Sequence, residues 1–143
     1  MKSALLLITL CCYLAISYGQ TDLEAIRRNA RFQNNLALVA LHNQVFGAEG
    51  VEKGLAKTEK ERECIEEKKD AALEEGNQIL AETVGKILPE VDRLVASGTQ
   101  DEIKAFLDKT DYPAYKKSAM EEFKKRLYKF IPGVQEKMAS CRK

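Results

Sequence analysis

Side chains that could carry out catalysis are few in this chain and lie far apart in the sequence. Its one histidine, His42, is the side chain best suited to general acid–base chemistry near neutral pH. Beyond residue 19 the candidate serine nucleophiles are Ser97, Ser118 and Ser140, and none lies in the Gly-x-Ser-x-Gly turn that exposes a nucleophile. We therefore predict that the protein is not an enzyme and has no catalytic residues; a hydrolase that uses His42 as its base is the alternative.

The sequence also lacks the spacings that hold metals and cofactors. Zinc sites use patterns such as Cys-x-x-Cys or His-Glu-x-x-His, and calcium loops alternate acidic residues around a glycine. None of these occurs, and neither does the Gly-x-Gly-x-x-Gly run that binds dinucleotides. We expect no bound metal and no cofactor.

The first 19 residues have the composition of a secretory signal peptide. Lys2 supplies a positive charge, residues 5–16 are almost wholly apolar, and small residues stand three and one positions before a cut after Gly19. The apolar core is shorter than the roughly 20 residues that span a bilayer, although an uncleaved membrane anchor is the alternative. We predict that residues 1–19 are removed and that residues 20–143 form a single secreted, extracellular domain without an integral membrane segment.

The remaining chain carries balanced charge. Of its 23 basic residues only Lys2 precedes residue 20, so the predicted domain has 22 basic and 22 acidic side chains. Binding to nucleic acid requires clustered Lys and Arg that neutralise phosphates, and no sustained basic tract occurs. Nucleic acid is therefore not an expected partner.

Two cysteines, Cys64 and Cys141, remain after the signal peptide. Two cysteines in an exported chain most simply form one disulfide. Of the 14 residues 57–70, 11 are charged, so packing alone would hold the helix around Cys64 weakly. Cys141 lies near a C-terminus that would fray if nothing held it. We predict an intramolecular Cys64–Cys141 bridge, with an intermolecular bridge or two free thiols as the alternatives.

Apolar residues recur at the three- and four-residue spacing of helices along the whole domain, and no convincing strand-like alternation occurs. Capping boxes at Thr21 and Thr99, and a proline in the first turn after Asp111, are expected to begin helices. The expected helices cover residues 21–46, 51–75, 80–97 with a kink at Pro89, 99–109 and 111–141, with turns at Gly47–Gly50 and Gly76-Asn77 and a bend or break at Pro132-Gly133. We predict an all-α fold, an irregular antiparallel bundle of five or six helices with one disulfide.

Residues 36–41, Leu-Ala-Leu-Val-Ala-Leu, are apolar on every side of the first predicted helix. A helical segment of that kind is usually buried at the centre of a bundle. The last predicted helix has the most regular apolar stripe of the chain. We therefore expect the first and last helices to be central.

Aromatic and aliphatic residues of these helices could line a cavity for a small apolar ligand, because pockets between helices often bind such ligands. The candidate ligand-binding residues, which share this apolar character, are Phe32, Leu36, Leu38, Val39, Phe46, Phe106, Tyr115, Phe123 and Leu127. The same residues would also form an ordinary packed core, so their spacing alone does not separate the two.

Two functions fit this sequence. The first is a secreted carrier or sequestering protein for a small hydrophobic ligand. The second is a secreted protein-interaction factor, such as an inhibitor, an effector or a structural component of a secretion, which would bind an extracellular protein through residues 57–70 and would have no ligand cavity. A cavity of several hundred Å³ would favour the first function, and an exposed apolar or charged face over a dry core would favour the second.

Overall fold

The computed structural model describes the backbone of residues 2–143 and the side chains of residues 21–143. Within this part of the chain there are five α-helices and one short 3-10 helix, and no strand. The elements are α1 (Lys2–Leu55), α2 (Glu59–Glu82), α3 (Leu88–Ser97), α4 (Gln100–Lys109), α5 (Tyr112–Ala139) and η1 (Ser140–Arg142). The all-α prediction is confirmed. The side chains of the predicted signal peptide lie outside the described residues, and its removal stays a prediction.

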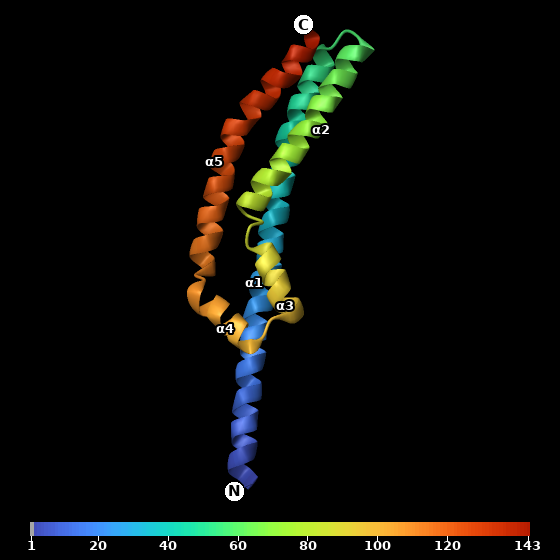
Figure 1. The fold of residues 1–143 in the computed structure, drawn as a ribbon. Helices are drawn as coiled ribbons and strands as arrows, with labels where there is room; N and C mark the ends of the chain where they lie inside the picture. Colours follow the sequence, from blue (N-terminus) through green and yellow to red (C-terminus); the bar gives the residue numbers. More distant parts are fainter. Residues whose placement is uncertain (1) are drawn as a thin grey trace.

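Helix α1 is the long spine against which the other helices pack (Figure 1). Helix α2 folds back beside its C-terminal half, and α5 runs along both α1 and α2 (Figure 1). The short helices α3 and α4 contact α1 further toward its N-terminus (Figure 1). Helices α1, α2 and α5 therefore form one end of the molecule, and α1, α3 and α4 build the other end with the start of α5.

The turn between α1 and α2 lies later in the chain than the glycines predicted. Helix α1 continues through Gly47 and Gly50 to Leu55, because neither glycine leaves the helical conformation and no glycine has a positive φ. The turn is set instead by Thr58, whose side chain accepts from the Glu61 N–H while the Glu61 carboxylate accepts from the Thr58 N–H. The predicted turn at Gly47–Gly50 is therefore wrong.

The helix start predicted at Thr21 is also wrong, because α1 begins at Lys2 and Thr21 lies within it. The capping box at Thr99 is confirmed: its hydroxyl accepts from the Glu102 N–H at the start of α4. The N-cap at Asp111 is confirmed as well, because its carboxylate accepts from the Ala114 N–H. Helix α5 passes through Pro132 without a break.

Gly76 does not end a helix, although the sequence predicted a break there. It lies within α2 and is buried, and a β-carbon placed on it would lie 2.5 Å from Leu41 Cδ1. The glycine therefore allows α2 to approach α1 closely. The chain breaks instead after Glu82, and α3 begins at Leu88 with Pro89 in its first turn. The predicted single helix with a kink at Pro89 is wrong, since the proline begins a new helix.

The side chain of Tyr115 forms hydrogen bonds with the backbone at this break between α2 and α3. Its hydroxyl donates to the carbonyl of Thr83 at 3.0 Å and accepts from the N–H of Ile87 at 3.2 Å. The Thr83 carbonyl also accepts from the Lys86 N–H, but the Ile87 N–H, just before α3, is satisfied by this hydroxyl, and leaving it unpaired would cost free energy. A side chain of α5 thus stabilises a turn 28 residues earlier in the chain.

The core consists of two clusters along the length of α1. The larger cluster, between α1, α2 and α5, includes Leu41, Val45, Ile65, Leu80, Phe123, Val134 and Met138. The smaller cluster, between α1, α3 and α4, includes Leu23, Ala30, Val91, Leu94, Ile103 and Phe106. The expectation that residues 36–41 are buried on every side is wrong: Ala37 and Leu41 are buried, but Leu36 and Val39 are about half exposed, because no helix covers the outer side of α1.

The Cys64–Cys141 disulfide is confirmed, with a Cα–Cα distance of 5.8 Å. It joins the charged first half of α2, where Ile65 is the only buried residue before Ala72, to η1 at the end of the chain. The Arg142 guanidinium also pairs with the Glu52 carboxylate on α1 at 2.6 Å. Together these contacts hold the C-terminus against both neighbouring helices.

Two glycines provide a matched test of this packing. Gly133 lies in α5, and a β-carbon added to it would have no atom within 4 Å, so we expect Gly133→Ala to raise the free energy of unfolding by about 0.5–1 kcal/mol. Gly76→Ala pushes a methyl group into Leu41 and should lower it by about 1–3 kcal/mol. Urea denaturation measures both changes. Equal effects of the two substitutions would contradict the close approach of α1 and α2.

The disulfide closes a loop of 77 residues, so its loss should destabilise the fold substantially. We expect the Cys64→Ser/Cys141→Ser variant to lose up to about 4–5 kcal/mol of stability in the chain-entropy description. Thermal unfolding followed by circular dichroism measures this loss, and limited proteolysis should then cut first in residues 59–70 and at the C-terminus. An unchanged Tm would show that packing alone holds these segments.

Tyr112 gives the fold a pH dependence at high pH. Burial, and secondarily the nearby Tyr115, raises the pKa of Tyr112 to about 12 from its ordinary value near 10. The stability that the neutral phenol contributes is therefore complete below about pH 10 and is lost as the pH rises toward 12. Tyr112→Phe should flatten the decline in unfolding free energy between about pH 9 and pH 11, measured by urea denaturation. An identical decline in the variant would rule out this assignment.

Candidate binding groove

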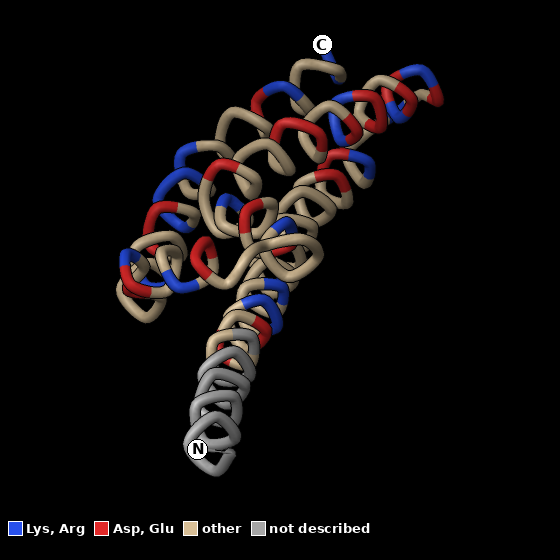
Figure 2. Tube along the Cα trace, turned by 60° about the horizontal axis from the view of Figure 1, so that its bottom comes forward, with Lys and Arg blue, Asp and Glu red and all other residues tan. Residues whose placement is uncertain are grey.

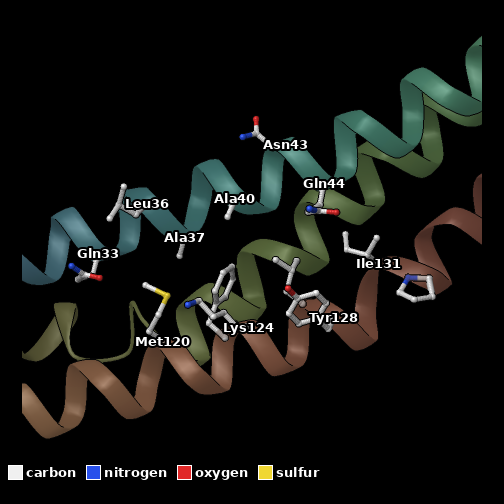
Figure 3. A pocket seen from close by; sticks show the side chains of 13 residues that line it. Gln33, Leu36, Ala37, Ala40, Asn43, Gln44, Met120, Lys124, Tyr128 and Ile131 are labelled. Carbon is white, nitrogen blue, oxygen red and sulfur yellow. The ribbon is translucent and has the colours of Figure 1, made fainter.

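An open groove of about 800 Å³ lies between α1 and α5 (Figure 3). Helix α1 contributes Gln33, Leu36, Ala37, Ala40, Asn43 and Gln44, and α5 contributes Met120, Phe123, Lys124, Leu127, Tyr128, Ile131 and Pro132. The groove thus follows several turns of α5, and its long shape comes from the two helices that line it.

Small residues on α1 and large residues on α5 create this hollow. Ala37 and Ala40 extend only a methyl group toward α5, so the side chains of the two helices do not fill the space between them (Figure 3). Phe123 and Ile131 are almost fully buried, and only the edges of their side chains reach the floor of the groove. The floor of the groove is therefore hydrocarbon.

Polar groups surround this apolar floor. The amides of Gln33 and Gln44 lie toward the two ends of the α1 side, whereas the Asn43 side chain points away from α5 (Figure 3). Lys124 supplies a positive charge from α5, and Tyr128 is 81% exposed. An apolar floor with a few polar groups at its edge is typical of sites that bind small apolar molecules with one polar end.

The groove does not include His42, the general base that the sequence suggested. His42 lies on another side of α1, where its ring packs edge-on against Phe46 at 5.7 Å between centroids. Among the described residues there is also no group of three or more His, Cys, Asp or Glu side chains that could hold a metal ion.

The structure brings together only part of the predicted ligand-binding set. Leu36, Phe123 and Leu127 line the groove. The remaining predicted residues lie elsewhere: Phe32, Val39 and Phe46 are exposed on α1, Leu38 packs against the larger core cluster, and Phe106 and Tyr115 belong to the smaller cluster. Successive residues of a helix are about 100° apart, so neighbours such as Leu36, Leu38 and Val39 point in different directions.

Sequence reasoning missed several lining residues, above all Met120 and Ile131 on α5 and the two alanines on α1. Met120 and Ile131 lie outside the regular apolar stripe of α5 that the sequence makes evident. Ala37 and Ala40 matter because they are small, and only their pairing with a particular stretch of α5 turns small residues into a hollow. That pairing is set by the tertiary fold.

Among the described residues, no helix combines the length and the hydrophobicity that crossing a membrane requires.

Comparison with known proteins identifies the relatives of this chain. No family model matches it, and no solved structure matches it. The chain is 73% identical over 137 residues to venom protein family 1 protein 1 of Platymeris rhadamanthus, an alignment that covers 96% of this chain and 97% of that protein. It is 30% identical over 141 residues to venom protein family 1 protein 2 of the same organism, covering 94% and 93% of the two chains. The chain therefore belongs to venom protein family 1.

Proposed function

We propose that this protein is a secreted venom component that acts by binding and not by catalysis. Its ligand is an elongated apolar molecule with an anionic or polar end, of the fatty-acyl class, which lies in the groove between α1 and α5. The observation that carries this proposal is the groove itself, a hollow of about 800 Å³ with a hydrocarbon floor. The names of its relatives support the venom origin.

The dimensions and lining of the groove support an acyl chain. Sites for small ligands commonly enclose about 300–1,000 Å³, so the volume is adequate. The floor offers Phe123, Leu127 and Ile131 to the ligand, and each methylene buried there would contribute about 0.8 kcal/mol. Because the groove is long and open, an extended ligand suits it better than a compact one.

Lys124 is the group that would select an anionic end. It is exposed at the edge of the groove, while its neighbour Lys125 on the next position of α5 does not line the groove. A carboxylate or phosphate near Lys124 would gain a charge-assisted contact without leaving water completely. The amides of Gln33 and Gln44 would accept hydrogen bonds from, or donate them to, a polar group at either end.

Titration with a fluorescent fatty-acid analogue tests this proposal. We expect saturable binding with a Kd of about 1 µM to 100 µM, because the groove is open to solvent on one side. Gln44→Trp, which fills the groove from α1, should weaken binding by about tenfold or more. Gln135→Trp is the matched control: it places the same side chain at an exposed position of α5 that does not line the groove, and it should leave the Kd unchanged.

A second pair of variants tests the anionic end. Lys124→Gln should weaken binding of the fatty-acid analogue several-fold, whereas Lys125→Gln should not. The difference should disappear when a neutral alcohol analogue replaces the acid. Absence of saturable binding to wild-type protein, or equal loss in both members of each pair, would contradict the proposed function.

The alternative function, protein interaction through the charged part of α2, has less support in this geometry. Several of these charges pair within the molecule: Glu66 contacts Lys53 of α1 at 3.3 Å, and Lys69 contacts Asp70 at 3.1 Å and lies 4.0 Å from Glu49 of α1. The hydrogen bond that Lys53 donates to Glu49 is the main cause that raises the pKa of Lys53. A face whose charges already have partners gains less from a new partner.

A further inference from the structure

The outer side of α1 is apolar and has no covering helix, which sets it apart from the rest of the surface. Seven large hydrophobic residues of the described chain are exposed, and all of them except Tyr128 lie on α1: Phe32, Leu36, Val39, Phe46, Val51 and Leu55. Charged residues are spread along α2 and α5 (Figure 2). Between Phe32 and Val51 the sequence has no Asp, Lys or Arg, and its one Glu, Glu49, is buried.

Three glycines lie on the same side of α1, and no described side chain packs against them. Gly47, Gly50 and Gly54 have no atom within 4 Å of a β-carbon position, and none has a positive φ. Glycine in the interior of a helix is unfavourable compared with alanine. A surface that another helix approaches closely would explain why the smallest side chain occurs three times at these positions.

Large and small residues of this face are arranged symmetrically about Asn43. Counting outward from Asn43, Val39 and Gly47 are four residues away, Leu36 and Gly50 seven, and Phe32 and Gly54 eleven. At three residues the order is reversed, with Ala40 before Asn43 and Phe46 after it. Offsets of three, four, seven and eleven residues follow one face of a helix.

We propose that two copies of the protein associate through this face, with their α1 helices antiparallel and a two-fold axis at Asn43. In such an interface residue i of one copy contacts residue j of the other, and j contacts i. The four pairs at three, four, seven and eleven residues from Asn43 then each join a large side chain to a small one: Phe46 to Ala40, Val39 to Gly47, Leu36 to Gly50 and Phe32 to Gly54. The two Asn43 amides meet at the axis, where each can donate to the other and fix the register.

The available area fits a dimer interface of modest size. The four large side chains that pair about Asn43 (Phe32, Leu36, Val39 and Phe46) are about half exposed, and at that exposure each offers on the order of 100 Å², or on the order of 400 Å² together. The backbone of the three glycines, Ala40 and the two asparagines at positions 35 and 43 add to this. A standard interface buries about 800 Å² on each partner, so these four side chains alone supply about half of that area.

The same face is less suited to a lipid surface. Helices that lie on membranes combine an apolar face with Lys and Arg along its edges. Arg27 and Arg31 precede most of this face and pair with Asp92, and Lys53 pairs with Glu49 and Glu66. The asparagines and the glycines fit a second protein helix, which needs hydrogen-bond partners and close approach.

Size-exclusion chromatography coupled to light scattering tests the association, with protein that cells express from residues 1–143 and secrete. We expect wild-type protein to be dimeric at micromolar concentration. Val39→Glu, which places a charge opposite Gly47 of the partner, should raise the dimer Kd by about tenfold or more. Ala71→Glu adds the same charge at an exposed position of α2 and should leave the dimer intact. Val39 does not line the groove, so this result is independent of ligand binding.

Oxidative cross-linking tests the register. Asn43→Cys should give a covalent dimer on mild oxidation, because the two introduced thiols meet at the axis. Asn35→Cys should not, because its two copies would lie about 24 Å apart along the antiparallel helices, at about 1.5 Å per residue. A wild-type monomer at all concentrations, including one that binds phosphatidylcholine vesicles instead, would overturn the proposal. Cross-linking of Asn35→Cys in preference to Asn43→Cys would overturn the register.

Discussion

The side chains of Leu41 and Val45 are fully buried between α1, α2 and α5, and the arrangement of the larger core depends on this contact. Because Gly76 has no side chain, Leu41 packs directly against the backbone of α2. Helix α2 therefore lies close to the inner side of α1, and α5 packs against that same side. The packing partners of this part of α1 therefore lie on one half of its circumference. Its other half stays bare, and both proposed binding surfaces are consequences of that one-sided packing.

The groove and the outer face of α1 are adjacent but distinct. Leu36, Ala40 and Asn43 lie at the edge that the two surfaces share, whereas Phe123, Leu127 and Ile131 belong to the groove alone. A second copy on the outer face would extend one wall of the groove without filling its floor. Ligand binding and self-association can therefore be altered separately by substitutions that lie away from the shared edge.

The end of the bundle that contains residues 57–70 is stabilised less by apolar packing than the core around Leu41. Residues 57–70 are mostly charged and bury little more than Ile65, so the hydrophobic effect contributes little there. The Cys64–Cys141 bridge and the Arg142–Glu52 ion pair compensate by tying the C-terminus to α2 and α1. Secreted proteins commonly supplement a small local core with a disulfide in this way.

The sequence was sufficient for the helical class, the disulfide and the caps at Thr99 and Asp111, because each depends on local spacing or on a short list of possible partners. The glycines led to wrong ends for α1 and α2. A glycine can end a helix, but it can also lie inside one where another helix packs closely against it, as Gly76 does. The cap at Thr58 was available from the same Thr-x-x-Glu rule and would have given the correct turn. The groove was only partly predictable: Phe123 and Leu127 follow from the stripe of α5, but the hollow depends on which turn of α5 faces Ala37 and Ala40.

The central claim is that the bare half of α1 is a binding surface. Native mass spectrometry of the protein purified from its natural secretion tests this most directly, because it reports bound copies and retained small molecules in one spectrum. We predict a mass of two chains, each with one disulfide, together with a bound species that organic solvent releases. A spectrum with only the bare single chain, at concentrations where weak dimers persist, would contradict this claim.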